Sequence, residues 1–452
     1  MRSIAIALLA AALPALAAPP VTAIVGGTVI TITKGTFKGT VILKDGKIAE
    51  IGENVSIPAG AEKVDATGMY VMPGIIDPHS HIAAEATNEG SISVASMVDI
   101  NDVINPEDIA IYRALAGGVT TIVTLHGSAD TIGGQCATIK MRWGKDAEGL
   151  KVQGAPPILK FALGENVKRA GSSQQRINIP GLSMPQAPLR YPGTRMGVED
   201  VLRQSFLKAK AYQAEWKEYN DQVKAGQHPI PPRRDLQLEP LVAVLEGRML
   251  VHTHAYRQDE ILMFLKVGDE FGFRTACLIH CLEGYKVAKE IAAHKAGVTT
   301  FSDWWDYKIE ARDAIPYNAA IMLKKGVDVS LHSDDAQLMR HLNQEAAKII
   351  RYGGISENEA LSLITIAPAR QIGLDKRIGS LEVGKDADVV IYDKHPLSNY
   401  AKVQKVFIDG IKYFDRDTDI SGRAAKEARK KALIQKEQEM MRRAAPPTRR
   451  PA

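Results

Sequence analysis

Between Pro73 and about Leu374, short apolar runs alternate with helical stretches, and this alternation restricts the fold more than any other feature. Amphipathic stretches such as Gln258–Phe271 and Ala336–Tyr352 separate many of the apolar runs. The predicted strands are Val71–Asp77, Val119–Leu125, Ala137–Met141, Ile158–Ala162, Met249–His254, Thr275–His280, Val298–Ser302 and Val327–His332. Eight strands alternating with helices over about 300 residues predict an α/β fold, a (β/α)8 TIM barrel.

The segments on either side of this region are rich in β-branched residues and turn signals. A hairpin pattern surrounds Asp45-Gly46, and "VFIDGIKYF" repeats that pattern near the other end of the chain. We therefore expect a small composite β-sandwich domain built from residues 19–72 together with 375–415. Residues 73–374 would form the barrel domain between these two pieces.

The first 18 residues have the pattern of a secretory signal peptide. Arg2 precedes an apolar run, Ile4–Ala12, and Ala15-Leu16-Ala17 offers small residues for cleavage. A membrane anchor is the alternative, but the run is shorter than the ~20 residues that span a bilayer. We therefore expect a periplasmic or secreted protein with no membrane span after cleavage.

Two further segments lie outside the regular pattern. Residues 165–248 are too long for a simple connection and contain a predicted long helix, Val198–Gly226; this insertion either carries substrate loops or decorates the surface. Residues 416–452 form a basic tail, and from Arg423 onward they hold ten Lys/Arg against three Asp/Glu. Since the net charge of the whole chain is +5, the other residues sum to −2, which argues against a nucleic-acid partner.

The stretch "MPGIIDPHSHI" places two histidines at the end of the first predicted barrel strand. In an extended chain His79 and His81 point to the same side, so both imidazoles can meet one metal ion. Further polar side chains stand at or just beyond the ends of other predicted strands: Lys160, His254, His280 and Asp334. Because parallel strands of a barrel share one mouth, we expect these groups to converge there.

These motifs, with "DATGMYVMPGIIDPHSH" and "IGSLEVGKDADVVIYD" as borders, resemble the amidohydrolase superfamily, in particular its imidazolonepropionase-like and prolidase-like branch. The resemblance implies that His79, His81 and Asp334 bind one metal ion. It also implies that His254 and His280 bind a second ion, and that a carboxylated Lys160 bridges the two. If Lys160 is an ordinary lysine, one ion suffices. His252 competes with His254 for its place, since both point to one side of the strand.

The resemblance and the donor types together imply a zinc hydrolase. Zinc accepts histidine nitrogen and carboxylate oxygen, and it lowers the pKa of water from ~15.7 towards 7. Asp334 would act as general acid and base. Tyr256, Arg257 and Gln135 are the residues that we expect to contact a small-molecule or short-peptide substrate. A homo-oligomer is compatible with the sequence.

Three functions compete at this stage. The first is an exported metal-dependent amidohydrolase that cleaves peptide-like or cyclic amide C–N bonds. The second is a deaminase of an amino-heterocycle on the same barrel, which usually needs one metal ion and no carbamate. The third is a non-catalytic secreted binding module. Such a module would not need the full set of predicted metal ligands.

Overall fold

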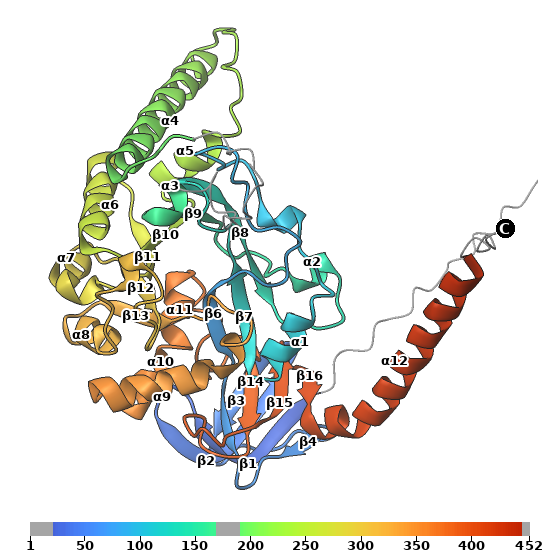
Figure 1. Ribbon diagram of the computed structural model, residues 1–452. Coiled ribbons are helices and arrows are strands. Elements are labelled where there is room, and N and C mark those ends of the chain that lie inside the picture. The colour runs from blue at the N-terminus through green and yellow to red at the C-terminus, as the bar shows by residue number, and fades with distance from the viewer. Residues whose placement is uncertain (1–20, 169–189, 445–452) are drawn as a thin grey trace, which may run out of the picture.

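The computed structural model describes residues 21–168 and 190–444. One eight-stranded sheet curls into a nearly closed barrel, and a separate eight-stranded sheet, built from strands of both chain ends, lies beneath it (Figure 1). This arrangement confirms the predicted α/β barrel with a second, composite β domain.

The barrel strands follow one another around the sheet in sequence order. They are β6 (Ile75–Ser80), β7 (Val119–Thr124), β8 (Ile132–Lys140), β9 (Ile158–Ala162), β10 (Leu250–Ala255), β11 (Thr275–His280), β12 (Gly297–Thr300) and β13 (Asp328–Leu331). Each predicted strand overlaps one of them, because long apolar, β-branched runs are buried on both faces in such a barrel.

The first predicted strand, Val71–Asp77, joins the ends of two real strands. Residues up to Pro73 belong to the composite sheet, and β6 begins at Ile75. The chain crosses between the sheets at Gly74, where a Cβ atom would lie 1.9 Å from Oγ1 of Thr120. Only a residue without a side chain fits this crossing, so the glycine divides an apolar run that looks continuous in the sequence.

The expectation that all eight barrel strands are parallel is wrong for β8. This strand runs antiparallel to both β7 and β9, whereas the other neighbouring pairs are parallel. Only seven residues connect β7 to β8. A parallel crossover needs a dozen residues or more, so the short connection forces the chain to turn back.

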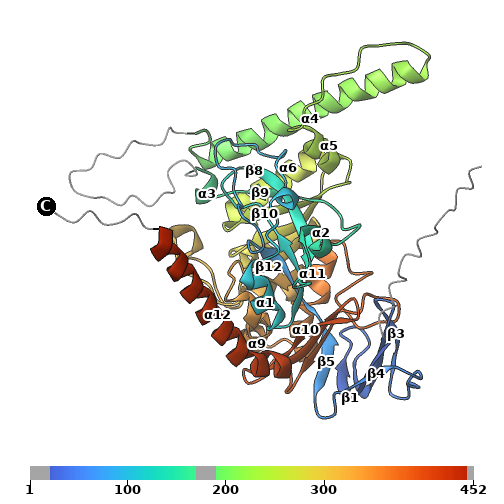
Figure 2. The same ribbon diagram turned by 90° about the vertical axis from the view of Figure 1, so that its right-hand side faces the viewer.

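Helices and short 3-10 turns cover the outside of the barrel (Figures 1 and 2). Helices α1 to α11 are Ile109–Leu115, Ala147–Leu150, Glu165–Lys168, Arg195–Lys224, Glu239–Leu245, Gln258–Phe271, Ala288–Ala293, Asn318–Lys324, Leu342–Gly353, Glu357–Ser362 and Ile366–Gln371. The 3-10 helices η1 to η4 are Ile100–Asp102, Gly284–Lys286, Ile309–Ala311 and Met339–His341. Among the described helices, none is long and apolar enough to cross a membrane.

The composite sheet has the order β16-β15-β14-β5-β1-β2-β3, with β4 beside β1. Its strands are β1 (Thr22–Ile30), β2 (Thr36–Lys44), β3 (Lys47–Gly52), β4 (Glu62–Asp65), β5 (Tyr70–Pro73), β14 (Val389–Tyr392), β15 (Val403–Ile408) and β16 (Ile411–Asp415). A separate apolar cluster with residues from both chain ends, including Ile24 and Val389, fills its interior. The strands lie in residues 22–73 and 389–415, so β5 extends one residue beyond the segment 19–72.

A buried lysine joins the barrel to the composite sheet. The Nζ atom of Lys140, at the end of β8, lies 2.8 Å from Asp386, 3.0 Å from Asp388 and 2.5 Å from Asp409. Its side chain is fully buried, so removal of the ammonium would leave three carboxylates with no central cation.

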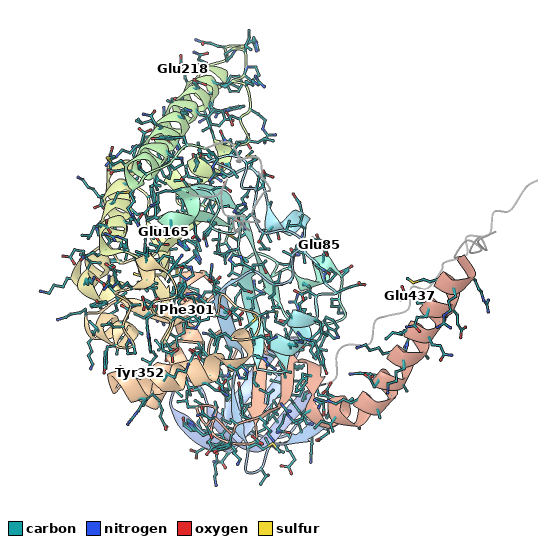
Figure 3. All side chains as sticks on the ribbon, in the orientation of Figure 1. Glu85, Glu165, Glu218, Phe301, Tyr352 and Glu437 are labelled. Atoms are coloured by element: carbon teal, nitrogen blue, oxygen red, sulfur yellow. The ribbon has the colours of Figure 1, made fainter. Side chains whose placement is uncertain are left out.

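The predicted insertion and tail contain the two longest helices. Helix α4 projects from the top of the barrel, with Glu218 far from Phe301 in the body of the barrel (Figure 3). Its bounds, Arg195–Lys224, agree closely with those of the predicted helix Val198–Gly226. Helix α12 (Arg416–Ala444) leaves the composite sheet and is mostly exposed along its length. The predicted signal peptide and residues 445–452 lie outside the described residues.

Candidate metal centre

The two histidines of the first barrel strand lie beside the predicted aspartate. His79 belongs to β6 and is buried, and His81 is the first residue after this strand. Oδ1 of Asp334 lies 3.5 Å from Nδ1 of His79 and 3.4 Å from Nε2 of His81. These three side chains offer ligand atoms within 4.8 Å of one another, a grouping that suits one metal ion.

Two further predicted ligands complete the cluster. The ring of His280, the last residue of β11, lies 5.0 Å from that of His79 and 4.7 Å from that of His254, between ring centroids. His254 comes from β10. The structure therefore brings His79, His81, His254, His280 and Asp334 together at one end of the barrel.

Lys160 lies in the middle of this cluster. It is fully buried on β9, and its Nζ atom is 3.2 Å from Nε2 of His79. Burial lowers the pKa of Lys160 to about 8, because desolvation disfavours the ammonium. At neutral pH part of the lysine is therefore a free amine, the form that can react with carbon dioxide.

The chemistry of the histidines fits a metal ion. Burial lowers the pKa of His79, His254 and His280 well below the usual range, so these rings are neutral and keep a lone pair. Neither ring nitrogen of His254, nor Nδ1 of His79, has a hydrogen-bond partner among the described residues, although all three atoms are buried. Buried polar atoms normally have a partner, and a divalent ion would provide one.

The structure separates the two candidates on β10. Nε2 of His252 lies 3.2 Å from the backbone carbonyl oxygen of Gln371, outside the cluster. His254 has no such partner and faces His280. The geometry therefore favours His254 as the ligand.

His332, the last residue of the predicted strand Val327–His332, also joins the cluster. Its Nε2 atom lies 3.1 Å from Nδ1 of His280, and its ring centroid is 4.9 Å from that of His79. His79, His280 and His332 form a second group with ligand atoms within 4.8 Å. The signal was present in the sequence, since His332 and Asp334 are two residues apart in the same way as His79 and His81.

The predicted substrate residues are not all at the cluster. Tyr256 stacks on His280 with ring centroids 5.0 Å apart and an angle of 7° between the planes. Arg257 is the residue that precedes helix α6, and its guanidinium pairs with Asp259 near the surface. The side-chain amide of Gln135 donates to the backbone carbonyl of Ser96. Of these predicted contacts, only Tyr256 touches a predicted ligand.

Lys308 lies close to the cluster but was not anticipated from the sequence. Its Nζ atom is 4.0 Å from the centroid of the Tyr256 ring, and it pairs with Glu310 at 2.9 Å. This ammonium adds to the effect of burial in lowering the pKa of His254. A lone lysine in a loop after a strand carries no pattern that distinguishes it from a surface residue.

His126, at the end of β7, is held by its own loop. Its Nε2 accepts a hydrogen bond from the backbone N–H of Glu89 at 2.9 Å, and Nδ1 lies 2.9 Å from the carbonyl oxygen of Gly127. Both nitrogens therefore have partners, unlike those of His254, so His126 fixes the loops beside the cluster.

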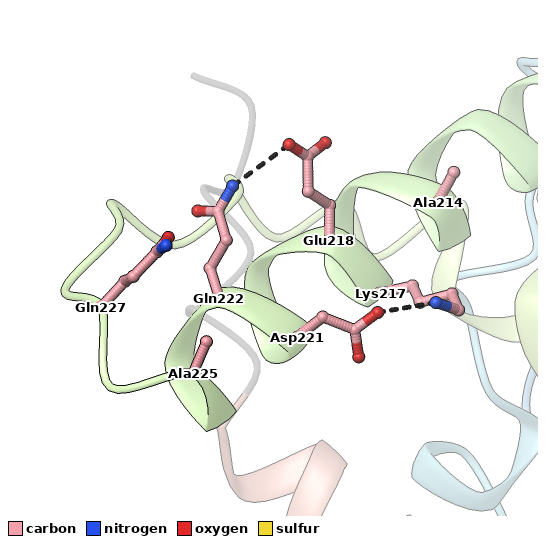
Figure 4. Close-up of a pocket in the computed structure, with 7 residues that line it drawn as sticks. All are labelled: Ala214, Lys217, Glu218, Asp221, Gln222, Ala225 and Gln227. Carbon is pink, nitrogen blue, oxygen red and sulfur yellow. Dashed lines mark hydrogen bonds and ion pairs between the residues drawn. The ribbon is translucent and has the colours of Figure 1, made fainter.

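A hollow on helix α4 is unrelated to this cluster. It has a volume of about 450 Å³ and lies near the outer end of the helix (Figure 4). Five of the seven residues that line it are charged or carry an amide, and the ion pair between Lys217 and Asp221 and the hydrogen bond from Gln222 to Glu218 are local to the helix. Nothing in it resembles a catalytic group.

Comparisons with known proteins agree with this geometry. The amidohydrolase family model matches residues 70–412, so the chain belongs to the amidohydrolase family. The crystal structure of an amidohydrolase from Thermotoga maritima MSB8 is 35% identical, with a TM-score of 0.78 over 87% of this chain and 100% of that chain. The chain is thus a metal-dependent hydrolase of this family with a histidine-cluster metal site.

Two curated relatives are more distant. Amidohydrolase tasK of Hapsidospora irregularis is 29% identical over 83% of this chain, and the match spans 40% of that protein. Imidazolonepropionase of Geobacillus sp. (strain WCH70) is 25% identical over 83% of this chain and 88% of its own length. Solved prolidases align at 17–18% identity with TM-scores of 0.51 and 0.52, which shows a common fold alone. The predicted superfamily is confirmed, and imidazolonepropionases and prolidases are among the proteins that the chain resembles.

Proposed function

We propose that this protein hydrolyses peptide-like or cyclic amide C–N bonds of small molecules, using two zinc ions. The observation that carries the proposal is the convergence of neutral, buried histidines, among which both nitrogens of His254 have no partner in the described part of the chain. Their nitrogen donors and the carboxylate of Asp334 match the ligand preference of zinc.

His79, His81 and Asp334 would hold one ion, and His254 and His280 the other. Bound there, a divalent ion supplies Lewis-acid chemistry, since it polarises a carbonyl group and lowers the pKa of water from about 15.7 towards 7. The imidazoles remain neutral across the working pH range because burial depresses their pKa.

Asp334 would move the proton. Burial raises the pKa of its carboxyl group to about 6, which is close to neutral pH. The carboxylate can therefore take a proton from the attacking water and give it to the departing nitrogen. Tyr256, stacked on His280, would hold that ring in place while the substrate enters.

Lys160 would be the bridging ligand after carboxylation. Its neutral amine nitrogen attacks the carbon of carbon dioxide, an N–C bond forms, and the proton is released to water. The product is a carbamate, a carboxylate-type ligand that would hold the metal together with the histidines. A protonated lysine has no lone pair for a cation, so the pKa of about 8 supports this step.

The test is a screen of zinc-loaded protein against dipeptides, N-acyl amino acids and cyclic amides, with amine release as the readout. We expect turnover of at least one class, its loss in the variant His79→Ala or with a chelator, and its retention in the matched control Arg257→Ala. Turnover that survives both His79→Ala and chelation would contradict the proposal. Protein that binds no zinc and cleaves nothing would favour a binding module.

A deaminase is the second candidate. The observation in its favour is the contact of 3.2 Å between the unmodified Lys160 and His79, which leaves less room for a second ion. Ammonia release from amino-heterocycles, without amide cleavage and with one zinc per chain, would select this function.

We also propose that the protein is exported, on the signal pattern of residues 1–18. N-terminal sequencing of protein recovered from the periplasm or medium should then begin after Ala17 or a neighbouring residue. Recovery only from the cytoplasm with the complete N-terminus would contradict export.

A further inference from the structure

The barrel sheet has a seam between its first and last strands. Strands β6 and β13 stand at the two ends of the hydrogen-bonded order, and no ladder joins them within the described chain. The segment before α11 fills part of the gap, because Ile364 accepts from the N–H of Ile76 and Leu363 accepts from the N–H of Leu331, both at 2.9 Å. The metal cluster includes residues from both sides of this seam, so its geometry depends on how the seam closes.

One carboxylate spans the seam at the level of the cluster. Asp77 of β6 is fully buried, and its Oδ1 accepts hydrogen bonds from the backbone N–H of His79 at 3.1 Å and of Ser333 at 3.3 Å. Its Oδ2 accepts from the hydroxyl of Ser333 at 2.5 Å. Three donors from two strand ends thus converge on a single side chain.

Both partners of Asp77 belong to the predicted metal site or adjoin it. His79 is itself a predicted ligand, and Ser333 directly precedes the predicted ligand Asp334. Asp334 has a positive φ of 52°, a conformation that costs energy for a residue with a side chain and persists only where the surroundings fix it. A hydrogen bond of 3.3 Å from its N–H to the carbonyl oxygen of His79 is a further direct contact across the seam.

We propose that Asp77 and Ser333 form a seam latch whose role is to position Asp334 against His79 and His81, so that the three can share one metal ion. The inference rests on the proposed function and adds two positioning residues to it. The latch acts through its partners, since neither Asp77 nor Ser333 appears in the groups that could hold an ion.

A purely structural serine would behave differently, and the chain offers a matched control. Ser330 lies on β13, is fully buried, and hydrogen-bonds to Oε1 of Gln371 at 2.7 Å rather than to a residue of β6. Each hydroxyl donates one buried hydrogen bond, and that of Ser333 also accepts a long one of 3.4 Å from the N–H of Asp335, so both variants should lose stability. Only loss of the Ser333 hydroxyl should disturb the metal site.

The experiment measures the zinc affinity of the full-length protein by competition with a chromogenic chelator, together with kcat, KM and Tm. For Ser333→Ala we expect zinc binding to weaken about 10–100-fold, as is typical when a partner that orients a ligand is lost. We expect kcat to fall while KM stays near the wild-type value. Ser333→Thr, which keeps a hydroxyl, should restore both, and Ser330→Ala should lower Tm alone.

Equal zinc affinities in Ser333→Ala and Ser330→Ala would overturn the latch. If Ser333→Ala does not fold, Asp77→Asn keeps the shape of the latch and replaces one acceptor with a donor, so it must weaken zinc binding in the same way. Because the zinc measurement needs no substrate, failure of the latch is distinguishable from failure to find amide turnover. Wild-type protein with no zinc affinity would overturn both proposals.

Discussion

The Nζ atom of Lys160 lies 3.2 Å from Nε2 of His79, with both side chains buried. An ammonium at this position occupies space and charge that a second cation would need. A carbamate at the same position replaces the positive charge of Lys160 with a negative one. The side chain can then bind a metal ion instead of repelling it. The state of this one lysine therefore decides between one ion and two.

We expect Lys160 to carry a carbamate in zinc-loaded protein. Protein supplied with 13C-labelled bicarbonate should show a carbamate carbon signal, and Lys160→Ala should lose that signal together with about one equivalent of zinc per chain. Lys47→Met, at a half-exposed lysine outside the cluster, is the control and should keep the signal. Two full equivalents of zinc in Lys160→Ala would contradict the prediction.

The two histidines of β10 should respond differently to substitution. His254→Ala should lower zinc content and reduce kcat by about 10²-fold or more, since the metal polarises the reacting carbonyl. His252→Ala removes the contact with Gln371 and should lower Tm while zinc content is kept. Metal analysis of the two purified variants shows which histidine binds zinc. Loss of zinc in His252→Ala but not in His254→Ala would assign the ligand to His252.

Metal-free protein should lose stability as the pH falls from 7.5 to 5.5. Burial depresses the pKa of six cluster or neighbouring histidines, whereas unfolded histidines titrate near 6.5. Asp77 and Asp334 act in the opposite sense, because burial raises their pKa to about 7 and about 6, so the folded state takes up protons there. Six histidines take up protons more readily in the unfolded chain, and only two carboxyl groups take them up more readily in the folded protein. The unfolded state therefore binds more protons over this pH range.

Each excess proton on the unfolded chain lowers the free energy of unfolding by about 1.4 kcal/mol per pH unit. The measurement is Tm by calorimetry on chelator-treated protein at several pH values. A Tm that stays constant or rises towards pH 5.5 would show that the histidines are not buried as neutral rings.

Lys140→Met should strongly destabilise the junction between the barrel and the composite sheet. The variant leaves Asp386, Asp388 and Asp409 without their central cation, and removal of one partner from a buried ionic group typically costs about 3–5 kcal/mol. Lys47→Met is the control, since Lys47 pairs with Asp386 but is half exposed, and it should cost less than about 1 kcal/mol. Urea denaturation of both variants measures the difference, and equal losses would refute it.

Tyr256 and Arg257 are neighbours in sequence with different surroundings. Tyr256→Ala removes the ring that stacks on His280 and should lower kcat/KM on the order of tenfold, as for other residues that orient a metal ligand. Arg257→Ala removes a surface ion pair and should leave kcat/KM within about twofold. Steady-state kinetics on the substrate from the screen compares them, and a larger loss in Arg257→Ala would contradict this assignment.

Much of the fold and of the metal cluster was predictable because both depend on repeated local patterns. The buried strands are apolar runs of the expected length, and His79, His81, His254, His280 and Asp334 follow from polar residues at strand ends. The direction of β8 was missed because the sequence pattern of a strand does not encode its direction. The short connection between β7 and β8 does indicate the direction of β8, because it is too short for a parallel crossover.

The details that remained unpredicted depend on contacts between distant residues. Gly74 divides two strands because Thr120 packs against it, and no local pattern contains that contact. Arg257 points away because it lies directly before helix α6 and two residues beyond the end of β10. Lys308 reaches the cluster from a loop, where spacing gives no information on direction.

The order of strands in the composite sheet has a consequence for synthesis on the ribosome. Strand β5 pairs with β14, so the first 73 residues lack this neighbour until the ribosome has released residue 392. A nascent chain arrested before that point would present β5 as a bare edge, and arrest before Asp386 would also leave Lys140 without its three aspartates. The composite sheet and its contact with the barrel are thus complete only after Asp409 has been translated, and chains truncated before that residue should be recognised by chaperones rather than accumulate as folded protein.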